Sequence, residues 1–261
     1  GVARFINNRF YYITKTDGLA DNQVNCVRCS AKGSIYVATN LGFNEIKSDK
    51  IHTISEENGL INSEVQTIIS DKAGNIWMGT MGGLARFQEK TDQYRDFNEE
   101  EGLFDLRIHS LVADKFDNIW IATNNGLYRY FMATDTIVRV QGIQTGSKLI
   151  NSLLFYNDST LIIGTALGFD KIVFDAQLQQ IIKQVNYDKQ NGFRFSENNL
   201  NAICKDEQNH VWFGTINGLT LYQPNLEDTV TDVPQVYISG ILLSNGVVDW
   251  KNLGYPIDNN S

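Results

Sequence analysis

Five polar side chains recur at one position of this chain and could bind a ligand. Each follows an apolar residue and precedes a small one, and the five are Asn25, Gln66, His109, Asn151 and Asn201. Planar amides and an imidazole suit a sugar, because its hydroxyl groups need matched donors and acceptors. The same side chains could instead bond neighbouring backbone and hydrate a channel, since buried polar groups need partners in either case. The sequence leaves both interpretations open.

Three further candidates lie in the segments that lead into these positions. Asn62, Arg107 and Asn198 each stand a few residues before one of the five. An arginine and two amides beside the recurring set would enlarge a surface that recognises hydroxyl groups. We therefore treat all eight residues as candidate ligand contacts.

Acid–base chemistry would have to come from recurring aspartates. Asp71, Asp114 and Asp206 each open a segment rich in Gly, Asn or Asp, which indicates a turn. Recurrence at turn starts is typical of side-chain capping, whereas a single active site needs groups that converge. The sequence therefore predicts no catalytic residue and no cofactor.

Two cysteines have the spacing of a metal-ligand pair, at Cys26 and Cys29. A zinc site usually needs a second such pair or histidines, whereas His52, His109 and His210 are scattered along the chain. Side chains three residues apart on an extended strand also point to opposite faces. We predict structural burial and no metal site.

The elements that must hold these residues follow a repeat. A glycine followed by Leu, Phe or Val recurs about every 42 residues, a period that indicates a repeat array. Each unit contains an apolar pair, a turn, a short apolar strand, a Thr-x-x-Gly turn and two more strands. The glycines are Gly1, Gly42, Gly83, Gly126, Gly168 and Gly218.

Tryptophan and threonine mark fixed places in the repeat. The tryptophans could stack on sugars, but the apolar run around them indicates a strand covered on both faces and favours core packing. The threonines begin the turn that ends on a glycine, so we expect a structural role for the whole set. Its members are Trp77, Trp120, Trp212, Thr80, Thr123, Thr215, Gly83, Gly126 and Gly218.

The repeat predicts an all-β chain. Four short strands in a unit of about 40 residues define a β-propeller blade, and no segment sustains the period of a helical repeat. We expect about five four-stranded blades over residues 1–223. Seven such units would need about 290 residues, so we expect an incomplete ring. Because Gly1-Val2-Ala3-Arg4-Phe5 aligns with Gly83-Leu84-Ala85-Arg86-Phe87, we also expect the chain to begin within a blade.

The end of the chain has a different pattern. Residues 224–234 are polar and acidic, which predicts a linker. Two apolar runs follow within residues 235–261 and are joined through Asn245-Gly246, a strong hairpin signal. Two strands alone are marginal in water, so we expect the beginning of an immunoglobulin-like β-sandwich that is truncated near Ser261.

Composition excludes some partners. The formal net charge is −8, whereas nucleic acid or an anionic membrane surface requires a basic patch. No apolar run approaches the roughly 18 residues of a membrane span. The sequence therefore predicts no nucleic acid contact by this region.

The units resemble the two-component regulator propeller repeat. That family's unit reads Gly-Leu-x-x-Asn-x-Val-x-x-Ile-x-x-Asp-x-x-Gly-Asn-Ile-Trp-x-Gly-Thr-x-x-Gly-Leu-x-Arg-Phe, and residues 59–87 match it nearly throughout, except where Ser63 replaces the Asn. Trp-x-(Gly/Ala)-Thr-x-x-Gly-Leu recurs from Trp77, Trp120 and Trp212. The first and fourth units carry Tyr36 and Ile162 in place of the tryptophan, and the end of the chain is similar to the start of the triple-tyrosine β-sandwich.

This resemblance implies a sensor function. Members are typically periplasmic halves of hybrid two-component sensors, followed by a membrane helix, a histidine kinase, a receiver and DNA-binding parts, and they signal as homodimers. The expected ligand is an oligosaccharide released from a polysaccharide, sensed to control glycan-utilisation genes, and the membrane would be reached only through downstream segments. Two alternatives are a protein-interaction scaffold and a propeller lyase or hydrolase.

Overall fold

The structure is a computed structural model that describes most of the chain. It covers residues 1–30, 33–48, 50–88, 91, 93–190, 193, 197–226, 241–243 and 246–248. Contacts divide the chain into two units, Gly1–Pro224 and Asn225–Ser261.

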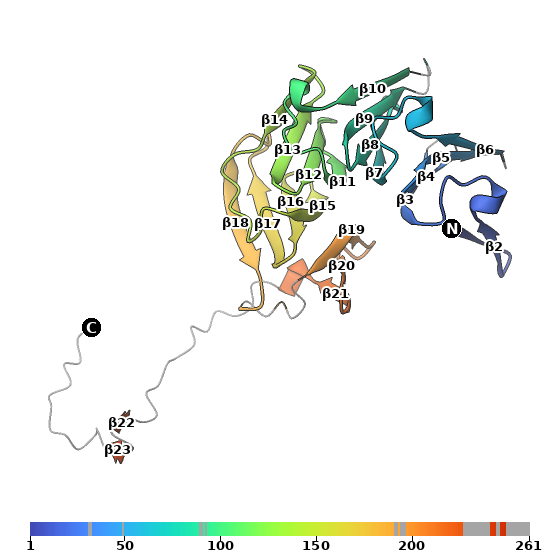
Figure 1. Ribbon diagram of the computed structural model, residues 1–261. Coiled ribbons are helices and arrows are strands. Elements are labelled where there is room, and N and C mark those ends of the chain that lie inside the picture. Colours follow the sequence, from blue (N-terminus) through green and yellow to red (C-terminus); the bar gives the residue numbers. More distant parts are fainter. Residues whose placement is uncertain are drawn as a thin grey trace. The chain divides into compact units, whose positions relative to one another are not determined.

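The first unit consists of antiparallel sheets (Figure 1). Four sheets have four strands, one has three and one has two, and strands adjacent in the chain pair with each other. We number the four-stranded sheets blades 1 to 4 and call the three-stranded sheet blade 5. Blade 1 contains β3 Val24–Cys29, β4 Ile35–Thr39, β5 Gly42–Lys47 and β6 Lys50–Ile54. Blade 2 contains β7 Val65–Ser70, β8 Ile76–Thr80, β9 Gly83–Gln88 and β10 Gln93–Phe97. Blade 3 contains β11 Ile108–Ala113, β12 Ile119–Thr123, β13 Gly126–Phe131 and β14 Thr136–Arg139. Blade 4 contains β15 Ile150–Asn157, β16 Thr160–Thr165, β17 Gly168–Phe174 and β18 Ile181–Tyr187. Blade 5 contains β19 Asn198–Lys205, β20 Val211–Thr215 and β21 Gly218–Tyr222. The two-stranded sheet contains β1 Val2–Ile6 and β2 Arg9–Ile13.

The turn between the first two strands of a blade is closed by its aspartate. In blade 2, Asp71 accepts hydrogen bonds from the backbone N–H of Asn75 at 2.8 Å and from Nε1 of Trp77 at 2.9 Å. Gly74 lies between them with φ of 87°, a conformation that favours glycine. The carboxylate thus shapes the turn and also satisfies the polar atom of a fully buried tryptophan.

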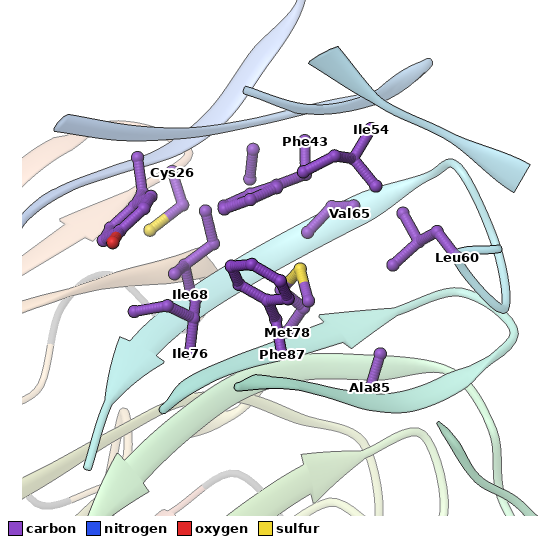
Figure 2. Packing of buried hydrophobic residues seen from close by; sticks show 12 residues of the cluster. Cys26, Phe43, Ile54, Leu60, Val65, Ile68, Ile76, Met78, Ala85 and Phe87 are labelled. Carbon is purple, nitrogen blue, oxygen red and sulfur yellow. The ribbon is translucent and has the colours of Figure 1, made fainter. Parts of the chain in front are cut away.

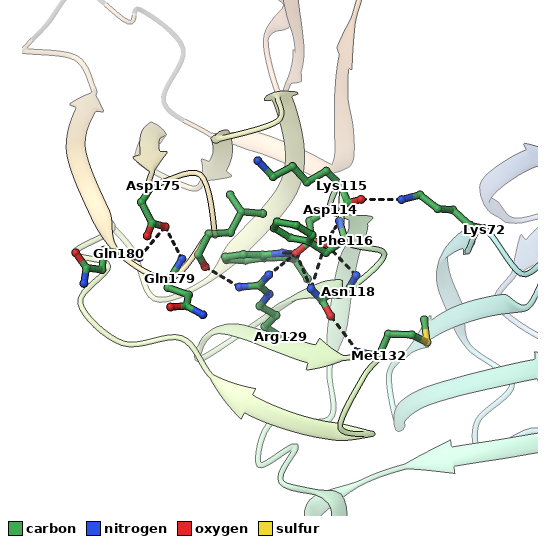
Figure 3. A network of polar contacts seen from close by, with 12 residues as sticks. Lys72, Asp114, Lys115, Phe116, Asn118, Arg129, Met132, Asp175, Gln179 and Gln180 are labelled. Carbon is green, nitrogen blue, oxygen red and sulfur yellow. Dashed lines mark hydrogen bonds and ion pairs between the residues drawn. The ribbon is translucent and has the colours of Figure 1, made fainter.

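The same tryptophan-to-aspartate bond recurs in two other blades. It joins Trp120 to Asp114 at 3.0 Å and Trp212 to Asp206 at 2.8 Å. In blade 3 the aspartate also pairs with the buried guanidinium of Arg129 at 2.6 Å, as Figure 3 shows. These three aspartates therefore have a structural role, as expected from their place at turn starts.

The Thr-x-x-Gly segment forms the turn between the second and third strands. Thr80 Oγ1 donates to the carbonyl of Gly83 at 2.7 Å, and Gly83 has φ of 137°. A Cβ at Gly83 would lie 2.9 Å from the carbonyl oxygen of Phe97, so a larger residue does not fit. Equivalent bonds close the other four turns, from Thr39 to Gly42, Thr123 to Gly126, Thr165 to Gly168 and Thr215 to Gly218.

Neighbouring blades pack through apolar faces. Figure 2 shows the cluster between blades 1 and 2, where Phe43 of one blade meets Met78 and Phe87 of the next. The first strands β3, β7, β11, β15 and β19 contact one another in succession. The second strand β8 also approaches β11 so closely that a Cβ on Gly79 would lie 2.5 Å from Ile108 of the following blade. The blades are therefore radial sheets whose first strands are innermost.

The fold expectation is confirmed: the chain is an all-β propeller of five blades, although only three strands of blade 5 lie among the described residues. In the second unit, β22 Ile241–Leu243 pairs antiparallel with β23 Gly246–Val248, where the sequence predicts a hairpin. Of the predicted linker, the structure describes only the short 3₁₀ helix Pro224–Leu226. The rest of the linker and of the predicted sandwich lies outside the described residues, so the sandwich stays a prediction.

Candidate ligand-binding site

Strand order determines which loops of the propeller lie together. In an antiparallel meander, the turn between the second and third strands lies at the same end as the segment that leads into the first strand. We call this end of the blades the loop face. It contains the Thr-x-x-Gly turns and residues 55–64, 98–107 and 140–149, whereas the aspartate-capped turns lie at the opposite end.

Two of the recurring amides link neighbouring blades. Asn25 Nδ2 donates to the carbonyl of Val65 in the next blade at 2.9 Å, and Asn151 Nδ2 donates to the carbonyl of Asn198 in the next blade. Asn25 Nδ2 also donates to the Asn40 side chain of its own blade at 2.8 Å. These contacts are those expected if the amides bond neighbouring backbone.

Two candidates of blade 2 make local contacts. Gln66 Nε2 donates to a carboxylate oxygen of Glu64 at 3.0 Å, and Asn62 Oδ1 accepts from the backbone N–H of Glu64 at 3.0 Å. Both side chains are half-buried. They shape the segment that leads into β7.

Two candidates of blade 5 connect it to earlier blades. Asn198 is buried, and its Nδ2 donates to the carbonyls of Thr165 at 2.9 Å and Gly168 at 2.6 Å. Asn201 has φ of 52° and accepts a hydrogen bond from Ser110 Oγ of blade 3 at 3.1 Å. The inner strands β11 and β19 are therefore in direct contact.

The remaining two candidates meet at blade 3. Asn124, in the Thr-x-x-Gly turn, lies between Arg107 and His109, and its hydrogen-bond partners assign the amide nitrogen to the side of His109 Nε2 and the oxygen to the side of the guanidinium. His109 is buried, whereas 58% of the Arg107 side chain is exposed. The structure thus joins an inner-strand imidazole to an exposed arginine on the loop face.

The Arg107 guanidinium keeps its edges available. The Asn124 oxygen is 2.8 Å from Nε and 3.1 Å from each Nη atom. An oxygen almost equidistant from three coplanar nitrogens must lie over the guanidinium plane, because an oxygen at the edge reaches only two of them. The N–H groups of Arg107 therefore do not point at the Asn124 oxygen, and they remain available as donors.

Two neighbours complete the cluster. Asp105 lies with one carboxylate oxygen 3.8 Å from Arg107 Nε and accepts from the Arg107 backbone N–H at 3.2 Å. Its other oxygen is buried and has no hydrogen-bond partner among the described residues. Phe104 on the same loop is 72% exposed. The loop face of blade 3 thus exposes a cation and an aromatic ring beside a largely buried carboxylate.

Sequence reasoning missed Asn124, Asp105 and Phe104. The residue type varies from unit to unit at the position of Asn124. Spacing along the sequence also does not show that Asn124 lies beside His109 of the paired strand. Asp105 and Phe104 precede Arg107 within a loop of no regular pattern. The signal that could have found Asn124 is the polar residue directly after the turn threonine, which in blade 1 is Asn40 and contacts Asn25.

Two further observations concern metal ions and membranes. Across the part of the chain that the structure describes, no three His, Cys, Asp or Glu side chains gather as metal ligands. Cys26 is buried as predicted, but the prediction of burial is wrong for Cys29, which is exposed because it points to the other face of the same strand. The described residues contain no helix with the length and apolar character to cross a bilayer.

Radial antiparallel sheets, each with a Thr-x-x-Gly turn between its second and third strands, define a β-propeller. Three of its blades carry a tryptophan at the same position of the repeat. Residues 59–82, 102–125 and 194–217 match the two-component regulator propeller family. Blades 2, 3 and 5, which contain these residues, therefore match the two-component regulator propeller repeat. The units outside these matches are those in which Tyr36 and Ile162 replace the tryptophan.

Solved structures share this fold. The extracellular domain described as that of the hybrid two-component system BT3049 from B. thetaiotaomicron is 19% identical, with a TM-score of 0.75 over 98% of this chain and 36% of that one. The corresponding domain of BT4673 is 21% identical, with a TM-score of 0.64 over 82% of this chain and 28% of that one. This chain thus spans about a third of those ectodomains.

A propeller enzyme is also similar. Virginiamycin B lyase from Staphylococcus aureus is 16% identical, with a TM-score of 0.56 over 78% of this chain and 71% of that one. At such identities the likeness concerns the fold alone. No curated protein matches the chain.

Proposed function

We propose that this chain is a non-enzymatic, periplasmic ligand-sensing region of a hybrid two-component regulator. The ligand is an oligosaccharide derived from a polysaccharide, and its binding controls glycan-utilisation genes. The family match and the likeness to two extracellular sensor domains support the sensor assignment. The Arg107–Asn124–His109 cluster carries the assignment of a ligand site.

The chemistry of the cluster suits binding. Sugar hydroxyls need donors and acceptors side by side, and Arg107, Asn124 and Asp105 present both. An exposed aromatic such as Phe104 gives a flat apolar face for a pyranose ring. His109 contacts the amide of Asn124 and not a carboxylate. No carboxylate therefore orients the imidazole as the general base that hydrolysis or elimination would use.

The structure also contains a connection by which binding could affect distant blades. Ser110 follows His109, donates to Asn201 of blade 5, and accepts from the backbone N–H of Leu153 in blade 4 at 3.1 Å. A ligand shifts an equilibrium only through unequal affinity for two states. We propose that the parent sensor is a homodimer and that its two states differ at contacts between blades or protomers.

Titration calorimetry of the chain against a panel of plant and microbial oligosaccharides tests this function. We expect one class to bind and Arg107→Ala to weaken it about tenfold or more, since a hydrogen bond to a charged group contributes about 1.5–3 kcal/mol. His109→Ala should also weaken it by displacing Asn124. Arg95→Ala is the matched control, because Arg95 lies on β10 and pairs with Asp135.

A lyase is the second candidate, and the likeness to virginiamycin B lyase is the observation that favours it. Chromatography of each oligosaccharide after prolonged incubation with the chain separates the two functions. We expect unchanged oligosaccharide. New products that disappear in His109→Ala would establish an enzyme instead. Binding unaffected by Arg107→Ala and His109→Ala would place the ligand elsewhere.

A further inference from the structure

Cationic side chains gather where blades 3 and 4 meet on the loop face. Arg107 lies against Asn124, and Arg139 Nη2 donates to the carbonyl of the adjacent Asn125 at 2.8 Å. Lys148 belongs to the segment that leads into β15. Three cations at one corner are unexpected in a chain of net charge −8.

A cavity of about 250 Å³ lies between two of these cations. Its lining includes Arg139, Lys148, Gln144 and Thr145, with Leu127 and Ile150 among its apolar walls. None of its lining residues is acidic. This volume is slightly below the usual range of ligand pockets, so it suits a single sugar unit and not a whole oligosaccharide.

The charges that face the cavity are not neutralised by protein. Arg139 uses one of its five N–H donors on the Asn125 carbonyl, and neither Arg139 nor Lys148 forms an ion pair within the described ranges. Both side chains are exposed. Arginine presents paired donors that match a carboxylate or sulfate, and lysine adds a point charge.

The wall of the cavity is held in place by a buried carboxylate. Asp170 accepts from Asn186 Nδ2 at 3.1 Å and from Gln184 Nε2 at 3.4 Å. Gln184 also exchanges two hydrogen bonds with the backbone of Gln144. Burial raises the pKa of Asp170. These bonds fix the backbone of Gln144 in the cavity wall, so this wall is formed in advance of binding.

We propose that this cavity binds the anionic group of an acidic sugar, so that the oligosaccharide of the proposed function carries a carboxylate or a sulfate. This inference rests on the proposed function and narrows its ligand class. The anionic unit occupies the cavity between Arg139 and Lys148. A neighbouring unit lies toward Arg107 across the Asn124–Asn125 turn, where the exposed guanidinium donates to its hydroxyl groups.

Matched pairs of probes test the charge of the ligand. Trigalacturonate, a mannuronate trimer and a sulfated galactan oligosaccharide are each titrated beside a charge-free counterpart, the methyl ester or the desulfated sugar. We expect at least one acidic probe to bind, its neutral counterpart to bind at least tenfold more weakly, and the affinity to fall as salt rises. Equal affinity for a neutral counterpart would overturn this inference and leave the proposed function standing.

Substitutions in the cavity test whether the anionic group binds there. Lys148→Gln removes an exposed charge without disturbing a contact, and Arg139→Ala removes the bidentate donor. Each should weaken the acidic probe about 10- to 100-fold and leave the neutral counterpart unchanged. Arg95→Ala is the control, and an unchanged melting temperature shows that each variant is folded.

Each remaining outcome is decisive. An acidic probe that binds Lys148→Gln and Arg139→Ala as tightly as the parent chain overturns the cavity assignment while oligosaccharide binding stands. A chain that binds none of the acidic probes and none of the neutral ones overturns both this inference and the proposed function.

Discussion

Blades 3 and 5 share a turn but differ in what covers it. Trp120 and Trp212 occupy the same place and donate the same hydrogen bond to an aspartate. Trp120 is 1% exposed, lies 5.3 Å from the Phe174 ring of blade 4, and stacks under Arg129 at 4.7 Å. Trp212 is half-buried.

The next strand shows the same contrast. Leu127 of blade 3 is 3% exposed and belongs to the core shared with blade 4, whereas Leu219 at the equivalent place in blade 5 is 65% exposed. Local sequence therefore determines the turn and the strand register, but a neighbouring blade supplies the burial. This division is typical of repeat proteins, where each unit is stabilised by its interfaces.

The largest effect should come from the two tryptophans. Trp120→Ala removes a fully buried ring and should lower the free energy of unfolding by about 3–5 kcal/mol. Trp212→Ala should cost clearly less, because part of its ring already contacts solvent. Urea unfolding of both variants checks this, and equal losses would show that the fold depends on the turn and not on the interface.

The aspartates give the next largest effect. Asp114→Asn leaves the buried guanidinium of Arg129 without its counter-charge and should cost about 3 kcal/mol, as for other broken buried pairs. Asp206→Asn, in an exposed turn, should cost less. The same unfolding experiment applies, with Asp114→Asn/Arg129→Met as a control that removes both charges and should recover stability.

A smaller effect concerns pH. Asp170 is fully buried in blade 4, whereas Thr220 at the equivalent place in blade 5 is half-buried. Because burial raises the pKa of Asp170 above its unfolded value, the folded state binds its proton more tightly. Stability contributed by this group should fall as pH rises from about 4 through the raised pKa and then stay constant.

Thermal melts across this pH range, with Asp170→Asn as the reference, isolate the group from other carboxylates. We expect Asp170→Asn to gain stability relative to the parent chain as pH rises. A stability difference between Asp170→Asn and the parent chain that does not change with pH would mean that hydrogen bonds to the carboxylate offset the cost of burying its charge. A difference that grows toward acid pH would mean that these hydrogen bonds exceed that cost.

The sequence predicted the repeat features well, because they are local. The spacing of Thr80 and Gly83 within one turn is enough to specify it, and the apolar run around Trp77 indicates burial without knowledge of the neighbour. The same reasoning could not distinguish Trp120 from Trp212, since their local sequences agree and only the covering blade differs.

The candidate site was predicted only in part, for the same physical reason. Arg107 and His109 lie two residues apart, but the amide that joins them comes from another strand of the blade. The cations that line the cavity belong to β14 and to the segment before β15. Their proximity is produced by the packing of blade 4 against blade 3, which single-sequence patterns do not contain.

The location of the ligand site is best tested through the three histidines. In a ¹H–¹⁵N spectrum of histidine-labelled chain, His109 reports on the loop face, His52 on the outer strand β6, and His210 on the aspartate-capped turn at the opposite end. Titration with the tightest oligosaccharide of the panel should shift the His109 signals alone. Movement of His52 or His210 with His109 unchanged would contradict a ligand site on the loop face of blade 3.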